Sequence, residues 1–230
     1  MKICLLYSGR DVPATKKRGF LCGLLSYVVR GDSLYTAKKL PFETADILAI
    51  SADDISPAVA HAIYNEAKSR NAHGVFLDTF SHFPREAFGT LAVFAPSKNG
   101  LSNRITPVIE TALTGGSLTE HIGNAPSQFA VSIRRTAQEF SLPAENAFGS
   151  TLSFSDLRRL ISRYSPDVFF SPELYRKYFI YEDSQGKVNL VLFDDAETIS
   201  HKLRLAKKHG ASHAFLVWNE VSDIFDEIFF

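Results

Sequence analysis

The segment 178–221 reads YFIYEDSQGKVNLVLFDDAETISHKLRLAKKHGASHAFLVWNEV and contains the elements that decide the fold. Its apolar runs 178–183 and 188–195 flank a polar Ser-Gln-Gly turn, which predicts an antiparallel hairpin. Residues 196–209 have helical periodicity and are followed by a glycine, and 213–220 predicts a strand. A strand, a helix and a strand in this order are typical of a βαβ unit, into which the hairpin is inserted.

The same alternation extends through the rest of the chain. Ser56 followed by Pro57 predicts the start of another helix, and Ser153 predicts a third. Apolar runs typical of strands covered on both faces, as in a parallel sheet, lie at 2–8, 46–51, 74–80, 90–97, 106–113, 129–137, 167–173 and 213–220. The segment 20–29 fits either a helix or a strand. We therefore predict an α/β fold, a compact (β/α)8 TIM-like barrel with a small hairpin insertion before the last βα unit; an open doubly wound sheet is the alternative.

The composition predicts a single globular domain over residues 1–230, with 45% apolar and 22% charged residues and a formal net charge of zero. Balanced charge argues against a nucleic-acid partner, and no apolar run approaches the roughly 20 residues of a membrane span. Two cysteines, and seven histidines without metal-binding spacing, predict no cofactor and no metal. The scarce cysteines and the lack of an apolar N-terminal leader predict a cytoplasmic location. The basic triplet at 16–18 is interpreted as a solvated loop.

The segment 178–221 resembles the end of the catalytic barrel of glycoside hydrolase family 18, which includes chitinases and spore-cortex glucosaminidases. In that family an aromatic hairpin leads to a Y/F-D-D turn, an S-I-x-x-K helix, a glycine-ended turn and a last strand that finishes in tryptophan. The matching residues are Phe193, Asp194, Asp195, Ile199, Lys202, Gly210 and Trp218. The resemblance implies a barrel of the chitinase type.

A second family signature, D-G-x-D-x-D-x-E at the end of the fourth strand, has its best counterpart in HGVFLDTF at 73–80. Gly74 and Asp78 match, His73 and Phe76 replace the first two aspartates, and Phe80 replaces the catalytic glutamate. In the family that glutamate protonates the glycosidic oxygen, while the third aspartate orients the acetamido group of the substrate. A phenyl ring cannot donate a proton, so the resemblance implies that the family mechanism fails at this position.

Two residues are candidates for binding a sugar. Asp78 ends a predicted strand, where active-site residues of barrels lie, or alternatively it caps the following turn. The resemblance makes Trp218 the floor of a sugar subsite, because an apolar sugar face stacks on an indole; a lone tryptophan in an apolar strand is otherwise a core residue.

Catalytic residues remain unknown, and a relocated acid beside Asp78 has three candidates. Glu110 is expected in the middle of an apolar strand, where an unpaired charge would be costly to bury. Glu173 is expected at a strand end, and Glu220 on the same side of a strand as Trp218. Each of them has the alternative of pairing with a cation or lying exposed at the rim.

Three functions follow. The leading hypothesis is a catalytically impaired glycoside hydrolase family 18-like barrel that binds an amino sugar at Asp78 and Trp218. The second is an active glycosidase with its acid at Glu110, Glu173 or Glu220. The third is a structural or protein-interaction barrel that forms an oligomer through its C-terminal tail. The residues expected on the surface of this tail are Phe225, Phe229 and Phe230.

Overall fold

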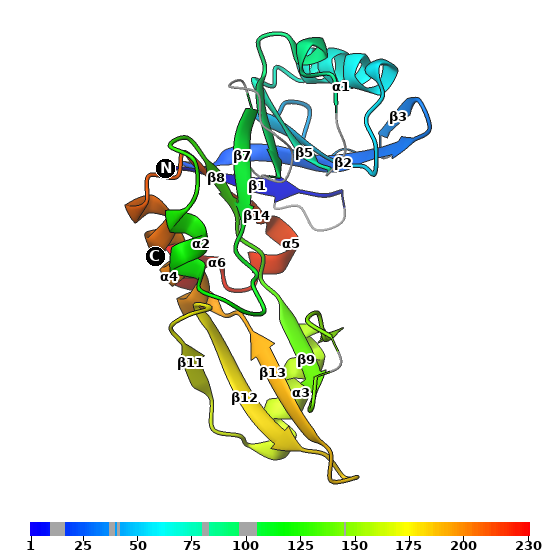
Figure 1. Ribbon diagram of the computed structural model, residues 1–230. Helices are drawn as coiled ribbons and strands as arrows, with labels where there is room; N and C mark the ends of the chain where they lie inside the picture. The colour runs from blue at the N-terminus through cyan, green and yellow to red at the C-terminus, as the bar shows by residue number, and fades with distance from the viewer. Residues whose placement is uncertain (10–16, 37–39, 41, 80–82, 97–104, 145) are drawn as a thin grey trace. The chain divides into compact units, whose positions relative to one another are not determined.

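The computed structural model describes residues 1–9, 17–36, 40, 42–79, 83–96, 105–144 and 146–230. The chain divides into two compact units (Figure 1). The barrel unit comprises Met1–Glu110, Ala125–Ser132 and Gly210–Ser222, and the insertion unit comprises Thr111–Asn124, Ile133–His209 and Asp223–Phe230. That residues 1–230 behave as one domain stays a prediction, which requires both units to unfold in a single transition.

The barrel unit is a closed ring of parallel strands whose order around the ring is their order along the chain. The ring contains β1 (Lys2–Tyr7), β2 (Leu21–Arg30), β4 (Ile47–Ser51), β5 (Gly74–Asp78), β6 (Ala92–Pro96), β7 (Ile105–Glu110), β8 (Ala130–Ser132) and β14 (His213–Val217). It closes because β1 pairs with both β14 and β2, and β3 (Ser33–Thr36) forms a hairpin with β2 outside the ring. The predicted TIM-like barrel is confirmed.

The prediction that residues 167–173 form a barrel strand was wrong. Residues 167–173 do not join the ring; within them β11 (Phe169–Ser171) is a short edge strand of the second sheet, with 53% of Phe169 exposed. The ambiguous segment 20–29 supplies the missing barrel strand, β2. Both segments are apolar, and composition does not distinguish a strand that is covered on both faces from an exposed edge strand.

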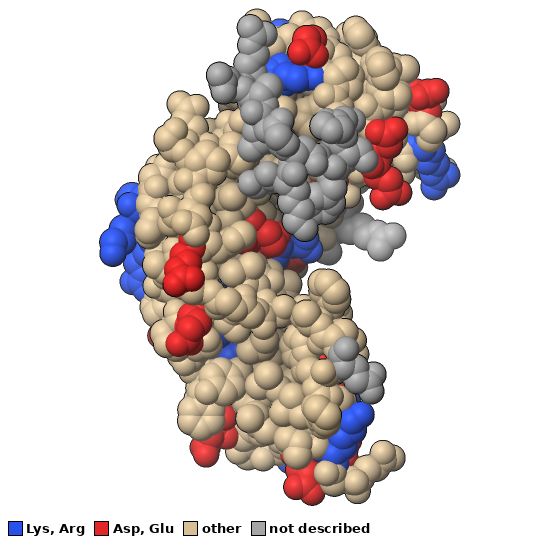
Figure 2. All heavy atoms as spheres, in the orientation of Figure 1, with Lys and Arg blue, Asp and Glu red and all other residues tan. Residues whose placement is uncertain are grey.

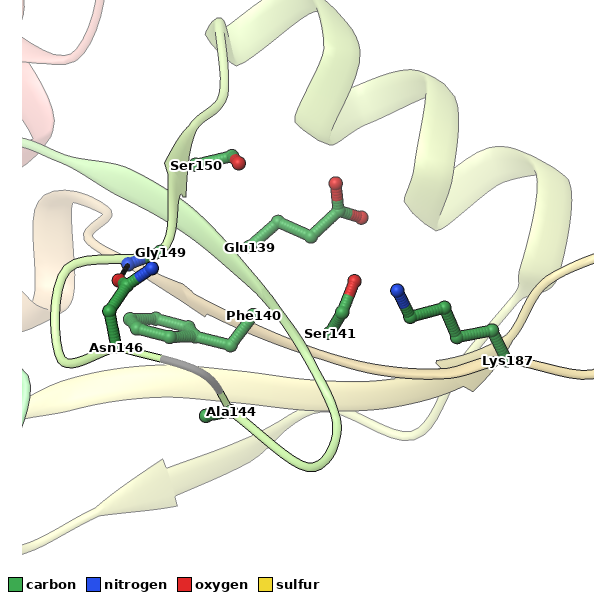
Figure 3. Close-up of a pocket in the computed structure, with 8 residues that line it drawn as sticks. All are labelled: Glu139, Phe140, Ser141, Ala144, Asn146, Gly149, Ser150 and Lys187. Carbon is green, nitrogen blue, oxygen red and sulfur yellow. Dashed lines mark hydrogen bonds between the residues drawn. The ribbon is translucent and has the colours of Figure 1, made fainter.

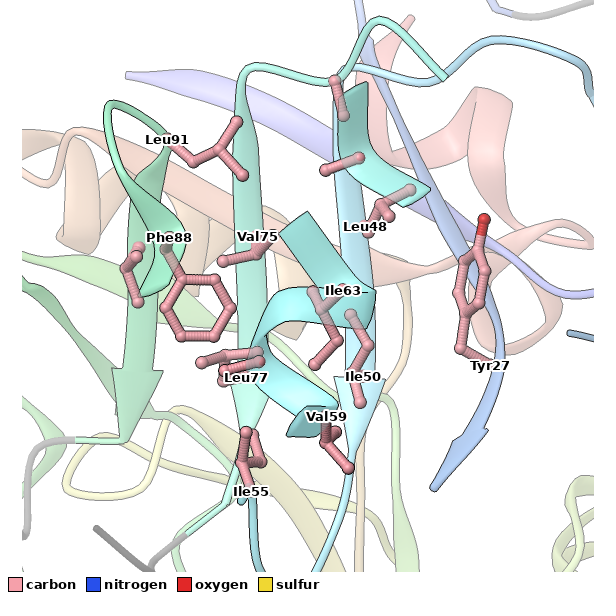
Figure 4. Close-up of a cluster of buried hydrophobic side chains, with 14 of the residues drawn as sticks. Tyr27, Leu48, Ile50, Ile55, Val59, Ile63, Val75, Leu77, Phe88 and Leu91 are labelled. Atoms are coloured by element: carbon pink, nitrogen blue, oxygen red, sulfur yellow. The ribbon is translucent and has the colours of Figure 1, made fainter. Parts of the chain in front are cut away.

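Alternate residues of the barrel strands enter two different cores. In β4, Ile47 and Ala49 belong to the inner core of the barrel, whereas Leu48 and Ile50 belong to the outer core. The outer core packs on the predicted helix, now α1 (Pro57–Ser69), capped by the Ser56 hydroxyl (Figure 4). Further described helices of this unit are η1 (Arg85–Phe88) and α5 (Trp218–Val221).

Most of the insertion unit follows β8 in the chain, and it contains a larger sheet than the predicted hairpin. Its antiparallel strands lie in the order β10-β9-β13-β12-β11. Besides β11 they are β9 (Ala137–Ser141), β10 (Ser150–Thr151), β12 (Arg176–Glu182) and β13 (Val188–Phe193). The hairpin β12–β13 is the predicted one. The helices are α2 (Leu118–Gly123), α3 (Phe154–Tyr164), α4 (Ala196–Lys208) and α6 (Phe225–Phe229).

A buried cluster of charges joins β12, β13 and α4. The Asp194 carboxylate lies 2.6 Å from Lys202 Nζ and 3.3 Å from Arg176 Nε, and all three side chains are fully buried. Asp194 also accepts hydrogen bonds from Thr136 and Thr198. Burial lowers the pKa of Arg176 from its ordinary value, and the charge of Asp194 opposes this shift. Two buried cations therefore contact one buried carboxylate in the interior of the insertion unit.

The C-terminal tail presents only part of the expected aromatic surface. Phe225 is buried, and its ring lies 4.8 Å from that of Phe229. The tail docks on its own chain, because α6 packs on α4 and the backbone carbonyl of Ile228 accepts a hydrogen bond from Ser200. Phe230 is 93% exposed. The interpretation of Phe225 as a surface residue was therefore wrong.

The face of the molecule in Figure 2 shows acidic and basic side chains scattered in small groups among uncharged ones. The described residues on this face form no extended basic surface of the kind that binds nucleic acid. In the described part of the chain, no helix has the length and apolar composition needed to cross a membrane.

Replacing Asp194 by asparagine is expected to destabilise the protein by about 3–5 kcal/mol, because the buried cations Arg176 and Lys202 would lose the carboxylate that both of them contact. Urea denaturation of the variant measures this loss. The control is Arg159→Gln, which breaks an exposed pair with Asp156 on α3 and should cost less than about 1 kcal/mol. A loss of similar size in both variants would contradict the role of the cluster.

Stability is expected to fall as the pH is lowered from about 6.5 to 4. Burial lowers the pKa of His213 in β14 to about 4 from 6.5, so the unfolded chain binds a proton at a higher pH than the folded chain does. Protons therefore favour the unfolded state throughout this window. Denaturation midpoints measured at several pH values should show a shallower decline in His213→Gln than in the wild type, whereas the same change at exposed His61 should keep the wild-type slope.

Candidate functional site

Strand alternation determines which side chains point into the mouth of the barrel. Phe76 of β5 and Val108 of β7 belong to the inner core. Side chains two residues further along the same strand lie on the same side, so Asp78 and Glu110 face inward at the carboxyl ends of β5 and β7. Both residues are exposed at these ends. This end of a barrel is where the active sites of TIM-barrel enzymes are found.

Asp78 is the last residue of β5, the fourth strand around the ring. Its register partner is Ser51, at the end of β4, and its backbone carbonyl accepts a hydrogen bond from the amide of Ala52. Among the described residues, no donor contacts the Asp78 carboxylate. Its neighbour Thr79 is buried, and Phe80 lies outside the described residues.

The position of Phe76 explains part of the departure from the family motif. Its ring is 9% exposed and stacks on that of Phe215, with centroids 4.7 Å apart and an interplanar angle of 13°. Phe94 packs edge-on against Phe215 at 5.1 Å. The barrel interior below Asp78 is therefore an aromatic core, in which a second aspartate would be buried among apolar rings.

Glu110 ends its strand and does not lie in the middle of it, as the sequence suggested. The strand begins at Ile105 and ends at Glu110, whose register partner is Ser132 on β8. The expected cost of a buried charge therefore does not arise, because the carboxylate is exposed at the barrel mouth. Asp78 and Glu110 are thus two inward-facing carboxylates on strands separated by β6.

Trp218 is the first residue of α5, directly after β14. The indole is only 7% exposed and lies 5.6 Å from the ring of Tyr7, at an angle of 39°. Lys17 Nζ lies over the indole, 5.6 Å from its centroid, and a backbone hydrogen bond joins Lys17 to the Tyr7 hydroxyl. Burial raises the pKa of Tyr7 to about 12, so this hydroxyl stays protonated. The interpretation of the basic triplet as a solvated loop was wrong for Lys17, which is half-buried on the tryptophan.

The other two candidate acids are not where the sequence placed them. Glu220 lies within α5, so strand alternation does not apply to it. Residues two apart on a helix differ by about 200° in direction, which turns Glu220 away from Trp218. Glu173 lies in the turn between β11 and β12 of the insertion unit, where it accepts a hydrogen bond from the Ser171 hydroxyl at 3.1 Å.

The sequence did not indicate three of the groups around this mouth, namely Ser51, Ser132 and Lys17. The two serines end strands adjacent to those of Asp78 and Glu110, and alternation along correctly bounded strands would have found them. No sequence signal brings Lys17 to Trp218, because this contact depends on closure of the ring. Within the described ranges, no three histidine, cysteine or carboxylate side chains gather as they would around a metal ion.

Comparison with known proteins gives structural neighbours. No protein-family model and no curated protein matches the sequence. The spore cortex-lytic enzyme SleL of Bacillus cereus superposes with a TM-score of 0.62 at 13% identity, over 94% of this chain and 70% of that one. The chitinase from Chromobacterium violaceum has a TM-score of 0.61 at 13% identity, over 99% of this chain and 97% of that one.

A GH18 chitinase from Cycas revoluta, solved in complex with (GlcNAc)3, has a TM-score of 0.61 at 12% identity and covers 99% of this chain and 97% of that one. Identities this low establish the fold alone. The resemblance of the segment 178–221 is therefore confirmed at the level of architecture: the chain has the (β/α)8 barrel fold of the glycoside hydrolase family 18 chitinases and of the spore cortex-lytic enzymes.

Proposed function

We propose that this protein binds an amino-sugar ligand at the mouth of its barrel and does not hydrolyse it by the family mechanism. The observation that carries the proposal is the end of β5, where Asp78 is followed two residues later by Phe80. An aspartate that binds the substrate is present at its family position, whereas the acid that breaks the glycosidic bond is replaced by a phenyl group.

The chemistry of Asp78 supports binding. An exposed carboxylate at this position can accept a hydrogen bond from the acetamido N–H of an N-acetylated sugar. Cleavage also needs a proton on the departing oxygen, and a positioned general acid contributes about 10²–10⁴-fold to such a step. Without that acid, the same contacts lead to a bound sugar that is not cleaved.

Trp218 supports a sugar subsite through its indole, on which the apolar face of a sugar ring can stack. With 7% of the residue exposed and Lys17 over the ring, a ligand has to displace the lysine side chain before it stacks. A cation over an aromatic ring is stabilised by about 0.5–2 kcal/mol. Displacing Lys17 costs about this much, which the contacts of a bound sugar can offset.

A second candidate function is an active glycosidase that uses Glu110 as its acid. The observation in its favour is the inward-facing position of Glu110 at the exposed end of β7. Glu220 and Glu173 have no such position on a barrel strand.

The cytoplasmic location and the oligomeric role of the tail remain predictions. Cell fractionation would test the location, and sedimentation at several concentrations would test the oligomeric state.

Removing the indole is expected to weaken binding of N-acetylglucosamine trimer at least tenfold. Calorimetric titration of Trp218→Ala measures this loss, and Trp218→Phe should retain part of the affinity because it keeps an aromatic face. The control is Phe169→Ala, which removes an exposed aromatic ring from the insertion unit. Lys17→Ala should bind several-fold more tightly than the wild type, since the shortened side chain no longer reaches the ring. Equal affinities of Trp218→Ala and the wild type, with melting temperatures unchanged, would disprove the subsite.

Restoring the acid is expected to restore cleavage. Chromogenic glycosides of N-acetylglucosamine oligomers should give no turnover with the wild type between pH 4 and 8, whereas Phe80→Glu should raise the rate at least 100-fold above the background. Phe80→Gln is the control, because it has a similar size and cannot act as an acid. Turnover by the wild type that Glu110→Gln abolishes would instead establish the second candidate function.

A further inference from the structure

The insertion unit contains a pocket of about 200 Å³ that no part of the proposed sugar site uses. It lies beside β9 and β10, and Lys187, which precedes β13, closes one side (Figure 3). Its polar groups come from Glu139, Ser141, Asn146, Ser150 and Lys187. A volume below the range of about 300–1,000 Å³ that is typical of drug-sized ligands restricts the pocket to a small molecule.

The loop between β9 and β10 is held in place along the pocket. Asn146 accepts hydrogen bonds from the amides of Phe148 and Gly149 at 2.9 and 3.0 Å. Gly149 has a φ of +60°, and a Cβ there would lie 2.6 Å from the carbonyl oxygen of Glu139. Only glycine therefore fits this close approach to β9.

The opposite side of the pocket is fixed by the turn of the β12–β13 hairpin. The Asp183 carboxylate accepts hydrogen bonds from the amides of Gln185 and Lys187, and the Lys187 carbonyl accepts one from the Asp183 amide. The Ser141 hydroxyl donates to the side chain of buried Asn189 at 3.0 Å. The pocket is thus preformed by backbone and side-chain hydrogen bonds on both sides.

Two opposite charges face this space and are not paired with each other. The Glu139 carboxylate accepts a hydrogen bond from the Tyr181 hydroxyl, which orients it on β9. Figure 3 shows the Lys187 side chain extending toward Ser141 and Glu139. Among the described residues, Lys187 Nζ makes no hydrogen bond or ion pair within 4.0 Å. Outside the pocket, the charge of Lys187 acts on Asp183 in the turn, where it contributes to lowering the pKa of that carboxyl.

We propose that this pocket binds a small zwitterion of the α-amino-acid type, with its ammonium group at Glu139 and its carboxylate at Lys187. A preformed polar space of this size, whose described lining has one charge of each sign with serine hydroxyls between them, is complementary to a molecule that carries both charges close together. A ligand with only one charge would leave the other side chain without a partner.

The test uses the full chain and a matched set of probes. L-Glutamine carries both charges, glutaramate lacks its amine, and 4-aminobutanamide lacks its carboxylate; L-serine is a second zwitterion. Titration monitored by protein NMR should show saturable binding of both amino acids, with L-glutamine at least tenfold tighter than either analogue. Glu139→Gln should bind L-glutamine no better than glutaramate, and Lys187→Met no better than 4-aminobutanamide.

Lys208→Met is the control, because it removes an exposed lysine in the last turn of α4, away from the pocket. It should keep the wild-type affinity, and thermal melting should show that both pocket variants stay folded. Absence of saturable binding of both amino acids, equal binding of L-glutamine and its analogues, or unchanged affinity in both pocket variants would overturn the proposal. So would loss of amino-acid binding in Trp218→Ala, which would assign the amino acids to the barrel mouth.

Discussion

Strand β1 is hydrogen-bonded along both of its edges, to β2 on one side and to β14 on the other. This double pairing closes the sheet, so that no strand of the ring has an unpaired edge. It joins residues 2–6 to residues 213–217, at opposite ends of the chain. The side chains that face inward at the mouth depend on this pairing, because the strand register fixes which of them lie close together.

Closure also gives the mouth its chemical character. The inner core contains the stacked rings of Phe76 and Phe215, which fill the barrel interior. Above this apolar core, Asp78 and Glu110 end their strands where they remain solvated. Trp218 follows β14, Lys17 precedes β2, and the ring places both of these strands beside β1, so that the two side chains meet. The position of a carboxylate at the mouth and the contact between an indole and a cation therefore follow from one pairing pattern.

The insertion unit explains why the segment 178–221 stands out in the sequence. Asp195 caps α4, while Asp194 and Lys202 form the buried ion pair that holds this helix on β13. Ile199 is fully buried on the same helix. The residues that carried the resemblance before Trp218 therefore have structural roles in this chain. They identify the architecture and say little about the reaction.

Much of the fold could be predicted because local patterns decide it. Ser56 and Pro57 begin α1, the capped segment after Asp195 forms α4, and the polar turn between β12 and β13 forms a hairpin. The barrel follows from the alternation of these elements. The positions of the candidate residues were predicted in part. Asp78 lies at the mouth, and so does Glu110, although the strand that carries Glu110 ends at this residue and not at 113, as predicted.

What the sequence determined by itself was the identity of the elements and the chemical groups available, above all Phe80 in place of a glutamate and a single tryptophan. Only the tertiary structure decided that β2 and not the segment 167–173 completes the ring, that Lys17 covers Trp218, and that Glu173 lies in a turn of the insertion unit. The physical reason is that helix caps and turns depend on neighbouring residues, whereas strand pairing and burial depend on partners far away in the chain.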